Sequence, residues 1–347
     1  MRFSFLLGPV AVLFAVALVL AATGLEHRPP EVAAPRAARW RISDPGQNII
    51  PWAGRPPEAN NLSGIALVEG GHYAMVSDHG AHLLWAEIAV DPDTGVIRSA
   101  KVLPQVATLA GCVDMEGCAL SPDRRSLVVS DEDDTGLTVV PMLPGQAGVL
   151  KPLAHRGNLL SRTNENLSLE SLATCVDGSG YWTMNEDALA GDGPRASRAG
   201  GAWLRLQKND LQLNPVRQWA YCTDPIPASL PIPFAISGVS DVLALPDGGL
   251  LVMERALSAE GFRLRLYNVF PVQEAPDVTA VAALDGAGAT PLTKKLLYEW
   301  RGKGNFEGIA HGPELKDGRR SLLLVTDDGD GFSESGVMVL RLERLTD

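Results

Sequence analysis

The hydrophobic pattern of this chain is a β-hairpin that returns five times. In one copy, Asp114-Met115-Glu116-Gly117-Cys118-Ala119-Leu120 leads through the turn Ser121-Pro122-Asp123 into an apolar run at 126–129 that ends in Ser130-Asp131-Glu132. Two short apolar runs joined by a polar turn predict a pair of antiparallel strands. The other copies have first runs at 61–67, 169–173, 239–244 and 306–310, and second runs at 73–78, 181–187, 250–255 and 322–328.

The five copies share a register. We count the spacing from a polar residue in the first run to an acid or amide at the end of the second. It is the same in three copies: Ser63 to Asp78, Glu116 to Asp131 and Glu170 to Asn185. It is one position shorter from Ser240 to Glu254, and it is longer from Glu307 to Asp327 because the turn of that copy is longer. A strand-and-turn unit repeated in this way predicts a propeller or an array of small sheets.

Each repeat carries further strand candidates after its hairpin. They are His82–Val90 and Ser99–Val106, Gly136–Met142 and Val149–Ala154, Ala202–Gln207 and Val216–Tyr221, Phe262–Phe270 and Lys295–Trp300, and in the last repeat only Gly336–Arg344. We expect Ala38–Ile42 to supply the missing strand, because a ring closed by the other end of the chain has no open sheet edge.

The pattern therefore predicts an all-β fold, a single closed β-propeller of residues 40–347. Five blades are marked by the motif. A degenerate sixth blade stays open as an alternative, because the spacing is longer around the inserts Asp224–Pro233 and Gln273–Pro291. We expect these inserts to be loops.

The composition and the N-terminal residues indicate the cellular compartment, and the net charge argues against one class of partner. With 347 residues, 46% of them hydrophobic, the chain can bury a large core, and its net charge of −11 argues against nucleic acid as a partner. Residues 1–24 carry Arg2, an apolar run from Phe5 to Ala22 and small residues suited to cleavage, which predicts a signal peptide or an uncleaved N-terminal anchor. Residues 25–39 are expected to form a flexible leader. The folded part is then exported, periplasmic or secreted, and contacts a membrane only through an uncleaved segment.

The chain has four cysteines, Cys112, Cys118, Cys175 and Cys222. An even number of cysteines in an exported protein is typical of disulfides. We expect Cys112 to bond to Cys118, and Cys175 then to Cys222. Four buried thiols are the alternative.

Propeller geometry gathers the polar motif residues. The start of the first strand in a hairpin lies beside the end of the second, and the first strands of the blades line the channel. We expect one acidic channel mouth, where Ser63 meets Asp78, Glu116 meets Asp131 and Glu132, Glu170 meets Asn185 and Glu186, Ser240 and Asp241 meet Glu254 and Arg255, and Glu307 meets Asp327 and Asp328.

Clustered carboxylates repel one another, and Ca²⁺, which takes six to eight oxygen ligands, relieves that repulsion. The candidate metal ligands are Glu116, Asp131, Glu170, Asn185, Glu186, Glu307 and Asp327. Glu132 or Asp328 is the candidate general base, and Arg255 is the candidate group for holding a substrate anion. In the alternative, each acid caps a strand end or makes a turn, and Arg255 pairs with an acid.

These motifs resemble the phytase-like domain family, which is described as having esterase-like activity. The resemblance covers roughly residues 45–345 and is carried by Asn61-Leu62-Ser63-Gly64, Asp114-Met115-Glu116-Gly117, Asn166-Leu167-Ser168-Leu169-Glu170-Ser171 and Asn305-Phe306-Glu307-Gly308-Ile309. It implies an exported bacterial propeller with phosphoesterase or esterase activity.

Two hypotheses follow. One is a monomeric, calcium-assisted hydrolase of a small anionic ester, with specificity set by the loops 188–201, 224–236 and 273–293. The other is a non-catalytic propeller that binds a ligand or a protein at the acidic mouth and holds calcium only for stability. The sequence has no Gly-x-Ser-x-Gly nucleophile motif and no phosphate-binding Gly-x-x-x-x-Gly-Lys loop.

Overall fold

The computed structural model describes residues 39–160, 168–226, 235–258, 261–271, 274–285, 288–328 and 333–345. All of them belong to the compact unit Val32–Asp347. The expected signal peptide and nearly all of the expected leader lie outside the described residues. Throughout the described ranges every regular element is a strand, and no helix is found.

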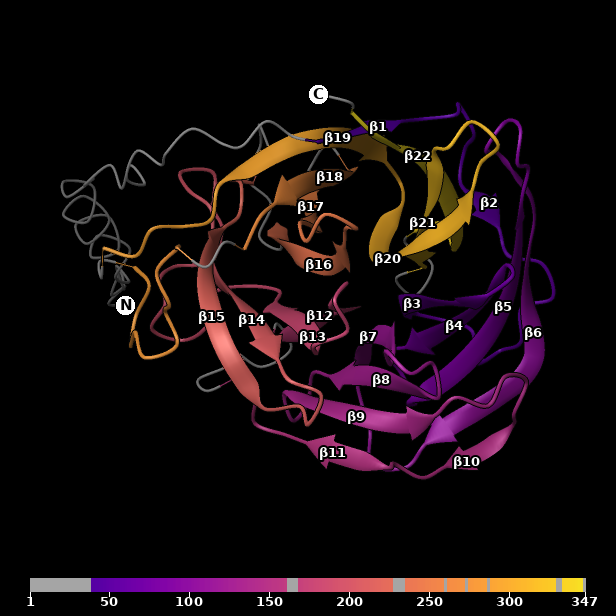
Figure 1. Ribbon diagram of the computed structural model, residues 1–347, viewed down its shortest axis with the longest axis horizontal. Helices are drawn as coiled ribbons and strands as arrows, with labels where there is room; N and C mark the ends of the chain where they lie inside the picture. Colours follow the sequence, from indigo (N-terminus) through magenta and orange to yellow (C-terminus); the bar gives the residue numbers. More distant parts are fainter. Residues whose placement is uncertain are drawn as a thin grey trace, which may run out of the picture. The chain divides into compact units, whose positions relative to one another are not determined.

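The strands form five sheets, which are the blades of a propeller (Figure 1). Blade 1 contains β3 (Leu62–Glu69), β4 (His72–Ser77), β5 (His82–Val90) and β6 (Ile97–Leu109), with the short β10 (Gly148–Leu150) added parallel to β6. Blade 2 contains β7 (Met115–Leu120), β8 (Ser126–Asp131), β9 (Gly136–Pro141) and β11 (Ala154–Arg156). Blade 3 contains β12 (Leu169–Thr174), β13 (Tyr181–Asn185), β14 (Trp203–Asn209) and β15 (Pro215–Cys222).

The remaining two blades complete the ring. Blade 4 contains β16 (Ile236–Ala244), β17 (Leu250–Ser258), β18 (Gly261–Val269) and β19 (Lys294–Gly302). Blade 5 contains β20 (Asn305–Glu314), β21 (Arg320–Asp327), β22 (Gly336–Arg344) and β1 (Trp40–Ser43), and the two-residue β2 (Ile50–Pro51) also pairs with β22. Each inner strand contacts the inner strands of both neighbouring blades, in the order β3, β7, β12, β16, β20 and back to β3.

The predicted closed all-β propeller is thus confirmed with five blades, and no sixth sheet occurs among the described residues. The expected N-terminal strand is also confirmed, because β1 pairs antiparallel with β22 from Trp40 opposite Arg344 to Ser43 opposite Arg341. The ring itself closes by packing between blades, since the inner strands contact one another without sharing a sheet.

One predicted strand, Val149–Ala154, is wrong. The segment is divided between two blades, because β10 pairs with β6 of blade 1 whereas β11 pairs with β9 of blade 2. Pro152 lies between them. A proline has no N–H to donate to a strand ladder, which accounts for the break.

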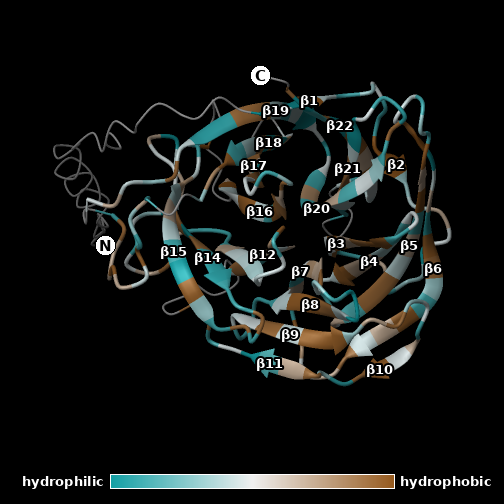
Figure 2. Cartoon of the chain, in the orientation of Figure 1, coloured by the Kyte–Doolittle hydropathy of each residue, from teal (hydrophilic) through white to brown (hydrophobic). Residues whose placement is uncertain are grey.

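The blades are held together by apolar layers. A separate hydrophobic cluster fills each interface between neighbouring blades, including the one between blade 5 and blade 1. Figure 2 shows the apolar residues concentrated along the strands, as in β5 and β9. The insert around 274–292 covers the edge of blade 3, since Val278 N donates to Gln218 O at 3.0 Å and Leu292 N donates to Ala220 O at 2.8 Å. This insert is a loop, as expected.

Every inner strand contains a β-bulge at the same place. The register with the second strand shifts between Leu62 and Ile65, Met115 and Cys118, Leu169 and Ser171, Val239 and Asp241, and Phe306 and Gly308. The displaced positions contain the motif residues Ser63, Glu116, Glu170, Ser240 and Glu307. A bulge leaves one residue out of the ladder and re-aims its side chain. The repeated motif of the sequence is therefore a repeated bulge.

The residue after the bulge forms a constriction of the channel. A Cβ on Gly64 would lie 2.6 Å from both Cys118 N and Glu116 O, and a Cβ on Gly308 would lie 2.3 Å from Ser63 O. In blade 4 this position is Asp241, whose carboxylate accepts N–H groups from Ile309 at 2.8 Å and from Val242 at 2.8 Å. Neighbouring backbones thus approach too closely for a methyl group at Gly64 and Gly308.

The predicted disulfides are wrong, because all four cysteines are free thiols. Cys112 lies before β7, close to Thr138 and Asp131, whereas Cys118 lines the far end of the channel. Cys175 lies in the turn after β12 and Cys222 at the end of β15.

We expect Gly64→Ala to destabilise the fold by about 1–3 kcal/mol, the usual cost of overpacking, because the methyl group meets backbone atoms that cannot rotate away. Urea denaturation measures the change. Gly200→Ala is the matched control, since a Cβ there has no atom within 4 Å. Equal stability of the two variants would contradict a constriction at Gly64.

Reduction should leave the stability of the folded protein unchanged. Because the four cysteines are free, dithiothreitol removes no cross-link and the melting temperature should be the same with and without it. Alkylation of the denatured, never-reduced protein should modify all four thiols, as read by mass spectrometry. If the mass shows only two modified thiols, the protein contains a disulfide and the prediction is wrong.

Candidate functional site

Five carboxylates meet at the channel mouth where the inner strands begin. The ligand oxygens of Asp78, Asp114 and Glu116 lie within 4.8 Å of one another, as do those of Glu116, Glu132 and Glu170. Glu116 belongs to both groups. We call these five residues the carboxylate cluster. Its members come from blades 1, 2 and 3, so the packing of these three consecutive blades around the channel assembles it.

The bulges place the two central glutamates. Glu116 and Glu170 occupy the displaced positions of β7 and β12. Glu170 is only 7% exposed, and among the described residues none donates a hydrogen bond to its carboxylate. Its environment is set instead by burial and by the neighbouring acids. Both of its oxygens therefore retain lone pairs for a ligand.

Glu132 is held in place more firmly. Its Oε1 accepts the Ser168 N–H at 2.5 Å, and the Ser168 hydroxyl donates to the Glu132 carbonyl at 2.9 Å. The Glu132 N–H in turn donates to the Asp114 carbonyl at 2.8 Å. These bonds join blade 2 to blade 3 and fix the Glu132 carboxyl against the cluster.

On the other side of the mouth, Arg255 balances two acids. Its Nη1 donates to Glu307 Oε1 at 2.7 Å and to Asn305 Oδ1 at 3.0 Å, and its Nη2 forms an ion pair with Glu186. Asn305 Nδ2 also donates to Glu307 Oε1 at 2.6 Å and to Asp327 Oδ2 at 3.2 Å. Glu186 and Glu307 are thereby compensated by a guanidinium. Among the described residues, the ion pairs of the carboxylate cluster are limited to that of Asp78 with the exposed His79, whose Nδ1 lies 2.7 Å from Asp78 Oδ1.

Three candidates from the sequence are engaged elsewhere. Asp131 accepts the N–H groups of Val113 at 2.8 Å and Asp133 at 3.1 Å, so its carboxylate caps its own loop. The Asn185 side chain accepts the Arg205 N–H at 2.8 Å and donates to the Asp187 carbonyl at 2.6 Å. Asp328 pairs with Arg55 at 2.5 Å. None of the three belongs to the carboxylate cluster.

The sequence pattern predicts Asp78 at the mouth, but neither Asp78 nor Asp114 is among the ligands expected from it. The available signal was the position two residues before each displaced residue. It is occupied by Asn61, Asp114, Ser168, Gly238 and Asn305. Ser168 binds Glu132 and Asn305 binds Glu307, so this position serves the mouth in several blades.

Burial and mutual repulsion favour protonation of these acids. Burial raises the pKa of Glu132 to about 7 and that of Asp78 to about 6, and it raises the pKa values of Glu116 and Glu170 well above the usual range for a glutamate. Neighbouring acids add to each shift. Burial also raises the pKa of Glu307 to about 8, although Arg255 opposes the change. A bound cation would reverse this balance.

The chemistry of the donor set fits calcium. The cluster offers only carboxylate oxygens, several of them without a hydrogen-bond donor, and hard oxygen ligands are what Ca²⁺ prefers. In the described part of the chain, neither of these two groups contains a histidine or cysteine ligand. His79 Nδ1 lies 2.7 Å from Asp78 Oδ1 at the rim, but the ligands that the groups share are hard oxygen atoms.

Comparison with known proteins points to one family. The family model Phytase-like, described as "Esterase-like activity of phytase", matches residues 57–330. No curated protein has a matching sequence.

Solved structures match with low identity. The PQQ-bound aldose sugar dehydrogenase from Streptomyces coelicolor is 14% identical, with a TM-score of 0.46, covering 89% of this chain and 100% of that one. The Myxococcus xanthus glutaminyl cyclase is 12% identical, with a TM-score of 0.38 and coverage of 86% and 97%. The Pseudomonas aeruginosa periplasmic gluconolactonase PpgL is 13% identical, with a TM-score of 0.38 and coverage of 85% and 91%.

Within the described residues, no helix is both long and apolar enough to cross a membrane.

Without metal, we expect the free energy of unfolding to fall as the pH rises from 5 to 8. The folded protein retains protons on Asp78, Glu132 and Glu307 up to pH values of about 6, 7 and 8, whereas the unfolded chain releases them near pH 4. Folding therefore binds protons in this range, and stability falls with pH. Urea denaturation in a chelator at pH 5, 6.5 and 8 should show a progressive loss of up to about 8 kcal/mol, because each retained proton contributes about 1.4 kcal/mol per pH unit.

Glu132→Gln is the matched variant, because it removes one of the titrating groups and should flatten the pH dependence. Stability that rises across this pH range in the chelator would mean that the acids are ionised in the folded protein.

Proposed function

Because the chain belongs to the Phytase-like family, described as "Esterase-like activity of phytase", we propose that it is an exported hydrolase of small anionic esters, assisted by calcium at the channel mouth. The observation that carries the proposal is the pair of carboxylate groups sharing Glu116. The proposed compartment is the periplasm or the medium.

The uneven charge of the mouth supports a cation site at the carboxylate cluster. Arg255 compensates Glu186 and Glu307 on the side of blades 3, 4 and 5. The carboxylate cluster of blades 1, 2 and 3 keeps its negative charge, or takes up protons in its place. A divalent cation gains most there, so Glu116 and Glu170 are the proposed ligands, with Asp78 and Asp114 completing the shell from the rim.

Bound calcium would polarise a phosphoryl or acyl oxygen and lower the pKa of a water molecule. The residues of the chain supply the rest. Glu132 is the proposed general base, because Ser168 fixes its carboxyl at 2.5 Å and its pKa of about 7 suits proton transfer near neutrality. Asp328, the other candidate from the sequence, is already paired with Arg55.

Arg255 acts as a positioning residue in this proposal. Its guanidinium is bound by Glu186 of blade 3 and Glu307 of blade 5, so it joins its own blade 4 to both neighbouring blades at the mouth. The same pairing supports the second candidate function, a non-catalytic propeller with structural calcium. The guanidinium that was expected to hold a substrate anion is already paired with two carboxylates.

Calcium should stabilise the protein, and the effect should grow with pH because metal ligands must be deprotonated. At a hundredfold excess over the dissociation constant we expect about 2.7 kcal/mol. Glu170→Gln should remove most of this gain, whereas Glu69→Gln, an exposed control outside the mouth, should keep it. Thermal melts with calcium or chelator measure the difference. An unchanged melt would exclude a calcium site at the cluster.

Turnover separates the two functions. We expect hydrolysis of p-nitrophenyl phosphate or of mono-p-nitrophenyl succinate, two anionic esters, to require calcium. Glu132→Gln should lower kcat by roughly 10²–10⁴-fold, the usual contribution of a general base. The calcium-dependent melt of this variant serves as the control for folding. Calcium binding without turnover of either ester would favour the non-catalytic propeller.

A further inference from the structure

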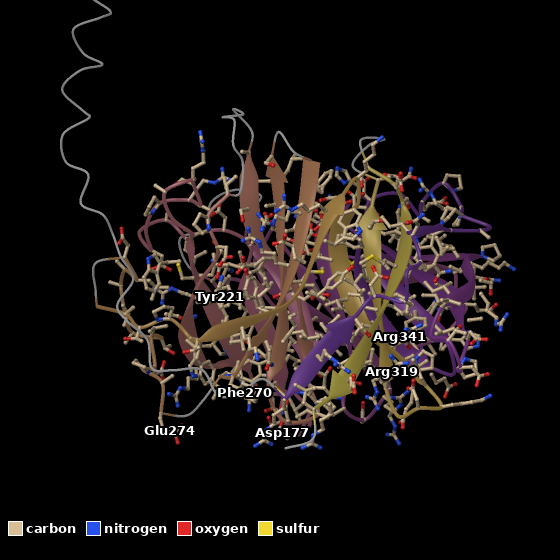
Figure 3. The ribbon with its side chains drawn as sticks, turned by 90° about the horizontal axis from the view of Figure 1, so that it is seen from above. Asp177, Tyr221, Phe270, Glu274, Arg319 and Arg341 are labelled. Carbon is tan, nitrogen blue, oxygen red and sulfur yellow. The ribbon has the colours of Figure 1, made fainter. Side chains whose placement is uncertain are left out.

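The end of the channel opposite the carboxylate cluster contains a cavity of about 430 Å³. It is lined by residues of all five inner strands that follow the constriction, among them Leu67, Leu120, Thr174, Ala244 and Ala310. Figure 3 shows Asp177 and Arg319, from the hairpin turns of blades 3 and 5, on one face of the molecule. The cavity opens on this face, since Gly178 and Arg320 line it. Its volume is in the range of small-molecule sites.

The charge of this cavity is opposite to that of the mouth. Among the described residues its lining contains Arg124 and Arg320 but no aspartate or glutamate, although the chain as a whole carries a net charge of −11. Arg124 donates to the Val68 carbonyl. Arg320 is half-buried, and its side chain has no hydrogen bond or ion pair in the described part of the chain. A partly desolvated guanidinium without an anion is a site for a carboxylate, which it binds through two parallel N–H groups.

His311 supplies a second unsatisfied group. Its Nε2 lies 2.9 Å from the Ala244 carbonyl, which can only accept, so Nε2 carries the proton and Nδ1 is an acceptor. Nδ1 is buried and has no hydrogen-bond partner among the described residues. Burial lowers the pKa of His311, and the nearby positive charge of Arg320 lowers it further, so the ring is neutral at pH 7. An uncompensated buried acceptor favours a ligand that brings a donor.

We propose that this cavity binds an amphiphilic hydroxy-carboxylate. The carboxylate pairs with Arg320, a hydroxyl close to it donates to His311 Nδ1, and an aliphatic chain covers the apolar ends of the inner strands. A phosphate dianion fits less well, because the lining is mostly apolar and offers one uncommitted cation. The site is separate from the proposed hydrolytic mouth, since the constriction at Gly64, Gly308 and Asp241 lies between them.

The probes are 3-hydroxyoctanoate, octanoate and 1-octanol, titrated into the whole protein and followed by saturation-transfer NMR and calorimetry. We expect octanoate to bind at least tenfold more tightly than 1-octanol and 3-hydroxyoctanoate more tightly still. Arg320→Gln should remove the preference for the carboxylate, and Arg320→Lys should restore part of it. Arg319→Gln is the matched control, because Arg319 lies beside Arg320 but pairs with Asp317 and does not line the cavity.

His311→Phe should abolish the preference for 3-hydroxyoctanoate over octanoate while octanoate still binds. Chelator and Glu170→Gln should leave binding unchanged, so this result is independent of the hydrolytic proposal. The assignment is overturned if the wild-type protein binds none of the probes, if Arg320→Gln binds octanoate as the wild type does, or if Glu170→Gln loses binding, which would place the ligand at the mouth.

Discussion

Five backbones converge on one axis, and their approach is so close that a methyl group cannot fit at several points between them. The rest of the molecule depends on this constraint. A regular strand would bring every side chain of its inner face into the same narrow space. The bulge in each inner strand removes one residue from the ladder and directs its side chain toward the wider mouth of the channel. Glycine or a hydrogen-bonded Asp241 then occupies most of the narrowest positions.

The same constraint explains why acids accumulate at the mouth. The displaced residue of each blade points toward the same volume, so three glutamates at this position become neighbours even though they are far apart in sequence. The fold opposes their ionisation by burial and by repulsion. Arg255 relieves this at one side only. Arg255 in β17, which pairs with two of the buried glutamates, distinguishes the two sides.

The repeat could be predicted from the sequence because its period and its apolar runs are local features. The hairpins, the closing strand and the gathering of Glu116, Glu170 and Glu307 all follow from strand geometry. The division of 149–154 between two blades could not be predicted from its hydrophobicity. Neither could the capping role of Asp131, because it depends on the loop that folds back to present the Val113 N–H. The cysteine pairs were predicted from number and compartment, which say nothing of the direction in which each thiol points.

The strand that completes blade 5 has a consequence for the way the chain folds. Trp40–Ser43 is the first described strand in the sequence, and it pairs with β22, one of the last. During synthesis it has no partner until nearly the whole propeller has emerged. Contacts between such distant residues form slowly, because a long loop must close first. Blades 1 to 4 can form in order from local hairpins, but the ring stays open, with one unpaired edge, until its two ends meet.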